Sequence, residues 1–344
     1  MYITDLRAIS PQATFDAGGL QDHPTSHSGN KYNAQEPDYA GLIAPILLRR
    51  MGKSIRMGIG AGLPLIQNQR NIDAIIIGSS EGGLEDCIKF LNQIVLYKEG
   101  TLTPTNFVQS TPNALAGSLA LMSRNTCYNI THVHKGNAFE NALIDAMLLF
   151  EEGKADTILA GNVEEISDYN FNIETLAGQF KVEDSTSENL LESGTPGTVC
   201  GEGASMFILK DKADDYLARI VDVAQISYPT EEEILGLIMD TLKKNNLRPE
   251  DIDTLILGKS GDSHTDVWYT AVNRKLFQEQ SIFTFKDLVG EYPTSIAFAT
   301  YLAACLISGR NIGWKLILPP KPIKHILIYN HYKGVQHGLI LMSI

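Results

Sequence analysis

The fold is decided by the stretch Tyr128–Gly161, which reads YNITHVHKGNAFENALIDAMLLFEEGKADTILAG. Its pattern predicts a short strand, a tight turn at Gly136, an apolar helix over 138–150 and a second strand from Thr157. The helix carries few charges on any face, which is typical of a helix inside a protein. A turn between a strand and a buried helix is a usual place for chemistry, because backbone N–H groups converge there and the helix dipole favours negative charge.

Composition limits the classes of protein that this chain can represent. The 344 residues are 44% hydrophobic and 20% charged, and the formal net charge is −12. This apolar content argues against disorder, and the length suffices for one large domain or two smaller ones. The negative charge argues against nucleic acid and an anionic membrane surface as partners, although a local basic patch can still bind an acidic carrier. Without a signal peptide or a membrane-spanning apolar run, we expect a soluble cytoplasmic protein.

The four cysteines are scattered, at Cys87, Cys127, Cys200 and Cys305. They form no CxxC pair and have no nearby histidines at ligand spacing, so we expect no metal site. Each is expected to be a small buried apolar residue, and Cys200 lacks the neighbouring histidine that a displaced nucleophile needs. The Gly-rich turn over 78–83 has neither the dinucleotide order nor a P-loop ending, so we also expect no cofactor.

Strands and helices alternate along the chain, which predicts a layered α/β fold. Each half shows strand, turn, helix and strand around an apolar core helix, over 138–150 in the first half and 292–308 in the second. We therefore expect two similar halves, residues 1–215 and 216–344, although no shared sequence period supports a duplication. The polar stretches 10–39 and 167–198 are expected to be irregular, and Thr230-Glu231-Glu232-Glu233 predicts a capping box.

Three stretches resemble the β-ketoacyl synthases of the thiolase superfamily. They are Asn106–Ala114, Gly136–Gly161 and Gly201-Glu202-Gly203-Ala204, which occur in the family's order. The resemblance covers most of the chain and implies a thiolase-like αβαβα fold built from two similar halves. It also implies acyltransferase chemistry of the 3-oxoacyl carrier-protein synthase kind, in fatty-acid or polyketide-type biosynthesis. The opening Met1–Asp16 further resembles synthase-type proteins of bacterial aryl-polyene and flexirubin pigment clusters.

The chemistry of that family needs a cysteine on the turn before the core helix and two histidines from the second half. The resemblance places Gly136 at the nucleophile position, Lys259 or Ser260 at the first histidine position and Glu291 at the second. A glycine has no side chain to acylate, and a glutamate repels developing negative charge. We therefore expect a pseudo-active site that cannot carry out the condensation by itself.

Four other residues are candidates for substrate binding. His134 and Lys135 lie next to the turn, where they either bind an acyl thioester or an anion or form a hydrogen-bonded structural pair. Phe107 resembles a family position at the acyl pocket and dimer edge, and a plain core or interface aromatic is an equal reading. Lys286 matches a lysine that the family carries on the same loop.

Two polar residues of the second half also have a structural interpretation. Glu291 is expected to form an ion pair with Lys286, Lys259 or Lys135, and the alternative is a repurposed acid or base. Asp266 is interpreted as the cap of the helix that follows it.

Two functions of different classes remain open. In the first, the chain is a non-condensing partner of the chain-length-factor type or an acyl-binding subunit. In the second, it is an acyltransferase or thioester-handling enzyme that uses His134, Lys135 or Glu291 in new roles. We expect a homodimer or a heterodimer with an active ketosynthase, with an acyl carrier protein as a further candidate partner. Whether any catalysis remains is left open at this point.

Overall fold

The structure is a computed structural model that describes residues 1–15, 24–310 and 323–344. Two five-stranded halves join into one mixed sheet with the order β10-β9-β11-β12-β8-β1-β7-β5-β3-β4. The strands of the first half are β1 (Tyr2–Ile9), β3 (Ala74–Gly78), β4 (Tyr128–His132), β5 (Thr157–Glu164) and β7 (Gly203–Lys210). Those of the second half are β8 (Ala218–Ser227), β9 (Thr254–Leu257), β10 (Ser281–Thr284), β11 (His325–Tyr332) and β12 (Gln336–Ser343).

The two halves have the same topology. When the strands of each half are numbered in chain order, their order across the half-sheet is third, second, fourth, fifth and first. In both halves the second, third and fourth strands are parallel, and the fifth is antiparallel to its two neighbours. The halves meet through a short pairing of β1 with β8, at Tyr2↔Arg219 and Ile3↔Ala218. The expected α/β fold of two similar halves is confirmed.

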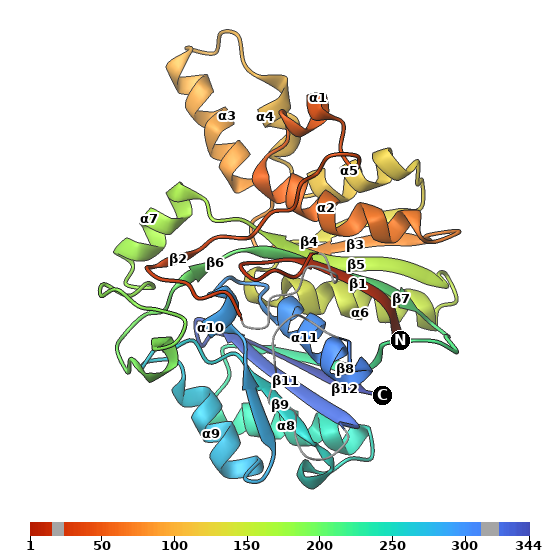
Figure 1. Cartoon of the computed structure of the whole chain (residues 1–344), viewed down its shortest axis with the longest axis vertical. Coiled ribbons are helices and arrows are strands. Elements are labelled where there is room, and N and C mark those ends of the chain that lie inside the picture. Colours follow the sequence, from red (N-terminus) through yellow and green to blue (C-terminus); the bar gives the residue numbers. More distant parts are fainter. Residues whose placement is uncertain (16–23, 311–322) are drawn as a thin grey trace.

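Helices complete five layers (Figure 1). Helices α2 (Lys53–Gln67) and α5 (Ala114–Ser123) cover the outer face of the first half-sheet, and α8 (Glu231–Lys244) and α9 (Val267–Leu276) cover that of the second. Between the half-sheets lie α6 (Ala138–Glu151) and α11 (Ile296–Ser308), whose apolar side chains join one cluster with strands of both halves. This αβαβα arrangement is the one that the resemblance implied.

The remaining elements are short or peripheral. They are β2 (Lys31–Tyr32), α1 (Pro45–Leu48), α3 (Leu84–Leu96), α4 (Pro104–Gln109), η1 (Lys135–Asn137), α7 (Asp168–Leu176), η2 (Leu190–Glu192), β6 (Cys200–Gly201), η3 (Pro249–Asp251) and α10 (Lys286–Val289). Helices α3 and α4 project from the body at the top of Figure 1 as a two-helix arm. The division into residues 1–215 and 216–344 stays a prediction; the repeated strand order supports a boundary between β7 and β8.

The central stretch has the predicted structure. Strand β4, helix α6 and strand β5 follow one another, and Gly136 lies in the short η1 turn before α6. The capping box is also confirmed: Thr230 Oγ1 accepts the N–H of Glu233 at 3.3 Å, and the Thr230 N–H donates to the Glu233 carboxylate at 2.7 Å. No helix in the described ranges has both the length and the apolar composition needed to cross a bilayer.

Several expectations are wrong. Helix α7 lies within the stretch 167–198 that was expected to be irregular, because none of its residues is buried and its sequence therefore lacks an apolar period. Cys127 is exposed, not buried. Residues 16–23 of the expected irregular stretch 10–39, and with them Asp16, lie outside the described residues.

Glu140 is a buried carboxyl in the first turn of α6. Its side chain is 1% exposed, and its Oε2 atom has no hydrogen-bond partner in the described structure. A Cβ on Gly338 of β12 would lie within 2 Å of Glu140 Oε1, so a larger residue there would require the Glu140 carboxyl to move. Burial raises the pKa of the Glu140 carboxyl to about 8.

Glu140→Gln is expected to remove a pH-dependent loss of stability. The folded state favours the neutral carboxyl. Its contribution to the free energy of unfolding is therefore complete below pH ~4.5 and is lost as the pH rises through about 8. Each unit of pKa shift corresponds to about 1.4 kcal/mol. Urea unfolding at pH 5, 6.5 and 8.5 should show the wild-type free energy of unfolding falling more steeply than that of the variant. Glu151→Gln, on the exposed end of the same helix, is the control, and identical slopes for all three proteins would contradict the prediction.

Candidate functional site

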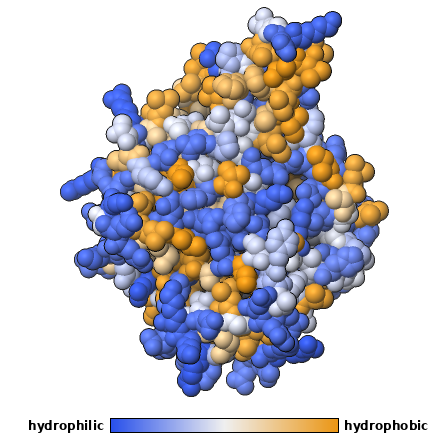
Figure 2. All heavy atoms as spheres, turned by 180° about the vertical axis from the view of Figure 1, so that it is seen from behind, coloured by the Kyte–Doolittle hydropathy of each residue, from blue (hydrophilic) through white to orange (hydrophobic). Residues whose placement is uncertain are grey.

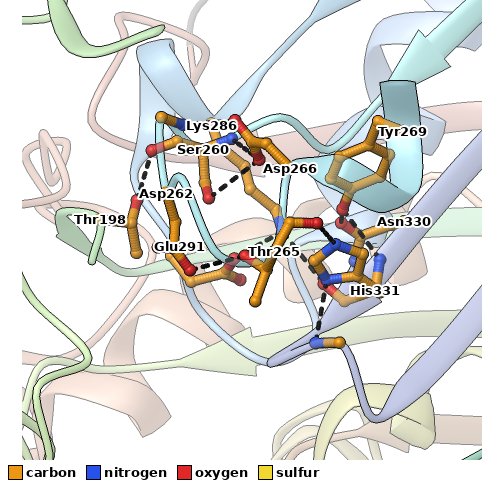
Figure 3. Close-up of polar contacts among 12 residues, drawn as sticks. Thr198, Ser260, Asp262, Thr265, Asp266, Tyr269, Lys286, Glu291, Asn330 and His331 are labelled. Carbon is orange, nitrogen blue, oxygen red and sulfur yellow. Dashed lines mark hydrogen bonds and ion pairs between the residues drawn. The ribbon is translucent and has the colours of Figure 1, made fainter. Parts of the chain in front are cut away.

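The candidate site lies where the two halves meet. The second to fourth strands of each half are parallel, so the turns that follow their carboxyl ends gather at one edge of each half-sheet. In the first half this edge carries η1, and in the second it carries the turn 258–262, helix α10 and the end of β11. The β11–β12 hairpin reaches across to η1, as the contact of Gln336 with Gly136 shows. Figure 3 shows the polar groups of the second half at this edge.

Gly136 has no space for a side chain. A Cβ at this position would lie 2.4 Å from the Cβ of Tyr332, which is far inside van der Waals contact. The Gly136 N–H, which points from the turn before α6, donates to Gln336 Oε1 at 2.9 Å. The turn is also strained, because Lys135 has a left-handed backbone with φ of 46°. The position therefore offers neither a nucleophile nor a free backbone donor.

Glu291 and Lys286 form a buried ion pair. Lys286 Nζ donates to Glu291 Oε2 at 2.5 Å and to the His331 carbonyl at 3.2 Å, and the side chains are 0% and 7% exposed. Of the three lysines considered from the sequence, Lys286 is thus the partner. Burial raises the pKa of the Glu291 carboxyl, and the Lys286 charge opposes this change. Glu291 Oε1 has no hydrogen-bond partner in the described part of the chain.

Ser260 lies in a turn that Asp266 holds in place. The N–H groups of Ser260 and Gly261 donate to the two carboxylate oxygens of Asp266, at 3.0 and 2.9 Å. The interpretation of Asp266 as a helix cap is therefore wrong, because its carboxylate bonds to the preceding turn and not to the first N–H groups of α9. Ser260 is 2% exposed, while Lys259 is half-buried and contributes charge near Asp266.

His331 is a second buried polar residue at this edge. Its ring stacks on Tyr269 with centroids 4.5 Å apart, and its Nε2 lies 3.0 Å from the Thr265 carbonyl. Burial holds the pKa of His331 well below its usual range, so the ring is neutral and donates to that carbonyl. Figure 3 shows His331, Lys286 and Glu291 in one connected group.

The other candidates from the sequence lie outside this group. His134 and Lys135 are exposed, and His134 Nδ1 lies 2.8 Å from the amide nitrogen of Asn141. Phe107 lies on α4 with 57% of its surface exposed, and its ring centroid is 5.2 Å from that of Phe90. The structure thus brings together Ser260, Lys286 and Glu291 and leaves the other three at the surface.

A pocket of about 560 Å³, which includes its mouth open to solvent, borders Glu291 and Tyr332. Tyr332 separates it from Gly136, because this residue lines the pocket and also contacts the turn. Cys200 lines the pocket too, but burial raises the pKa of its thiol to about 12. The thiol is therefore protonated at neutral pH, and the pocket holds no thiolate for acyl transfer.

Comparisons with known proteins agree on the fold. A family model described as the N-terminal domain of β-ketoacyl synthases matches residues 22–175. The ishigamide ketosynthase/chain length factor structure has a TM-score of 0.81 at 13% identity, covering 99% of this chain and 98% of that chain. A β-ketoacyl synthase from Burkholderia phymatum STM815 has a TM-score of 0.79 at 14% identity, with coverage of 99% and 98%.

The chain has the ketosynthase fold. The resemblance to the β-ketoacyl synthases that the sequence suggested is thereby confirmed. A third structure is the ketosynthase ApeO in complex with its chain length factor ApeC from Xenorhabdus doucetiae, with a TM-score of 0.75 at 15% identity and coverage of 100% and 97%. Among curated proteins, none matches this ketosynthase-like chain at a significant level.

Sequence reasoning missed several residues of the candidate site. Tyr332 and Gln336, which close the space at Gly136, lie about 200 residues away from it in the sequence. Glu164 and Glu165 at the end of β5 line the pocket. These two could have been found, since a pair of carboxyls directly after a buried parallel strand marks the edge where ligands bind in α/β sheets.

Gly136→Ala is expected to destabilise the chain by about 1–3 kcal/mol, because the new Cβ overlaps Tyr332. Gly136→Cys should do the same and should not become acylated by malonyl or acyl thioesters, which intact mass spectrometry measures. Gly117→Ala is the matched control, because its Cβ meets nothing within 4 Å and the change should stabilise α5 at this exposed position. The double variant Gly136→Ala with Tyr332→Gly tests the cause: a recovery of stability supports it, and additive losses contradict it.

Lys286→Met is expected to cost about 3–5 kcal/mol, because it leaves the buried Glu291 carboxylate without a partner. The double variant Lys286→Met with Glu291→Leu should regain most of that stability, since no buried charge remains. Urea unfolding at pH 7.5 measures both. A double variant that is as unstable as the sum of the two single variants would refute this account of the ion pair.

Proposed function

We propose that this chain is a non-condensing, chain-length-factor-like partner of an active ketosynthase. The observation that carries the proposal is the contact of Gly136 with Tyr332, which fills the place of a nucleophile on the turn before α6. The buried pair of Lys286 with Glu291 supports it, because a carboxylate at this edge opposes an oxyanion. An acyl-binding role for the chain belongs to the same proposal.

Known assemblies support a ketosynthase as the partner. The structures with the same fold include a ketosynthase bound to its chain length factor, and one of an acyl-carrier protein in complex with its ketosynthase. An acyl carrier protein is therefore a further candidate partner of the assembly. For the pathway, we propose fatty-acid or polyketide-type biosynthesis of the aryl-polyene kind, which rests on the resemblance of Met1–Asp16.

The projecting arm and the edge of the sheet supply a surface for the partner. Strand β4 is the last strand of the first half-sheet, so one side of it has no neighbouring strand in the described structure. The arm of α3 and α4 exposes large apolar side chains, and Figure 2 shows hydrophobic residues along it below its tip. These side chains are Leu91, Val95, Leu96, Tyr97, Phe107 and Val108. Such a cluster is typical of a protein interface.

The alternative enzyme finds less support. His134 and Lys135 lie at the surface, while Glu291 is buried and paired with Lys286. No hydrogen bond or ion pair among the described residues joins either of the first two to Glu291. The described residues therefore show no pair of His134 or Lys135 with Glu291 that could act as a combined acid and base.

Co-purification with the active ketosynthases of the same organism tests the proposal. We expect one of them to form a stable heterodimer with the tagged chain, and the chain alone to leave acyl and malonyl thioesters unchanged. Val95→Asp and Phe107→Asp should weaken the heterodimer at least tenfold, because each places a charge in the apolar face of the arm. Val267→Asp is the matched control, since Val267 is also exposed, at 56%, and lies on α9 at the other end of the molecule in Figure 1.

One result would contradict this function: turnover of an acyl thioester by the purified chain that His134→Ala abolishes, which would favour the enzyme. A heterodimer that Val95→Asp and Phe107→Asp leave as stable as the control would contradict the proposed surface, because the partner would then bind elsewhere.

A further inference from the structure

The pocket beside Glu291 has carboxyl groups on several sides. They come from the turn after β3, the end of β5, helix α7 and the segment after α10, and they belong to Glu81, Glu164, Glu165, Glu174 and Glu291. None of the described residues that line it is a lysine, an arginine or a histidine. The pocket is therefore unsuited to an anion such as a phosphate or a carboxylate.

One of these carboxyls has an acceptor oxygen that no group in the described ranges of the chain satisfies. Glu291 is 7% exposed and lines the pocket, and its Oε1 atom has no partner, while Oε2 binds Lys286. An unpaired buried acceptor costs about 1–3 kcal/mol, so the folded chain gains from a ligand that donates to it. By contrast, both oxygens of Glu164 are occupied, by Ser80 and Thr294.

The rest of the wall is largely aromatic. Phe171, Phe180, Tyr292 and Tyr332 line the pocket, and the first two stack with ring centroids 5.0 Å apart. Lys31 Nζ lies 4.0 Å from the centroid of Phe171, so an ammonium of the chain already lies on this aromatic cluster. Aromatic faces attract cations through the ring quadrupole, and they also cover the apolar body of an organic cation.

We propose that this pocket binds a small organic ammonium, with its nitrogen donating to Glu291 Oε1 and its carbon chain against the aromatic wall. The carboxyls of Glu165 and Glu81 supply further negative charge around the bound nitrogen. An inorganic cation fits less well, because no cluster of three or more His, Cys, Asp or Glu side chains in the described residues is arranged to hold a metal ion. This site is separate from the partner surface, so it does not depend on the proposed heterodimer.

Titration calorimetry with n-butylammonium chloride tests the site. The measurement is made at pH 8.5, because burial raises the pKa of Glu165 to about 7 and of Glu164 to about 8, and both are then largely ionised. We expect saturable binding of butylammonium by the full chain. Butan-1-ol and butyrate, which keep the carbon chain without the positive charge, should bind at least tenfold more weakly, and potassium chloride should not compete at equal concentration.

Three variants connect the binding to the named groups. Glu291→Gln should weaken butylammonium binding at least tenfold, because it removes the charge beside the unused acceptor. Glu165→Gln does not touch Lys286 and should also weaken binding, which guards against a change of fold in the first variant. Asp184→Asn, exposed on the loop that follows Phe180, is the matched control and should bind like the wild type.

The outcomes separate the sources of binding. Equal binding of butan-1-ol would show an apolar cavity only, and competition by potassium would show an inorganic cation site. Either result, unchanged binding by both glutamine variants, or no binding of butylammonium would overturn the proposal.

Discussion

The close approach of the β11–β12 hairpin to the turn before α6 is the constraint on which this site depends. Two segments about 200 residues apart meet so tightly that only a residue without a Cβ fits between them, because the Tyr332 side chain begins where that atom would lie. Gln336 then binds the N–H of Gly136, so the turn is held from both sides. The path of the hairpin backbone brings Tyr332 to this place, and it thereby excludes a side chain from the turn.

The polar groups of the second half near this contact bind one another and the backbone. A buried lysine neutralises the carboxylate of Glu291, a neutral His331 donates to a backbone carbonyl, and Asp266 binds two backbone N–H groups. Each of these groups has a fixed partner, which is the pattern of buried polar residues that maintain a fold. The exception is Glu291, whose Oε1 has no partner among the described residues and which lines a pocket with aromatic rings and further carboxyls.

The sequence alone predicted the elements whose burial produces a clear period, and it failed where burial is absent or contacts are distant. Helix α6 and the parallel strands around it were predicted because their apolar residues pack on both sides. Helix α7, with no buried residue, has no such period. The ion pair of Glu291 was predictable from charge, since a buried carboxylate needs a cation, but the choice of Lys286 depends on folding. Tyr332 and Asp266 act through tertiary contacts that no local pattern contains.

The repeated strand order gives the chain a pseudo-two-fold axis, which exchanges α6 with α11, since each helix precedes the fourth strand of its half. The turn at Gly136 and the turn at Glu291 are thus symmetry mates, two copies of one helix start within a single polypeptide. One copy carries Gly136, which has no side chain and lies against the hairpin, and the other carries Glu291 beside a pocket. Because the two turns differ in this way, a molecule built from two similar halves has a pocket beside one turn and close packing at the other.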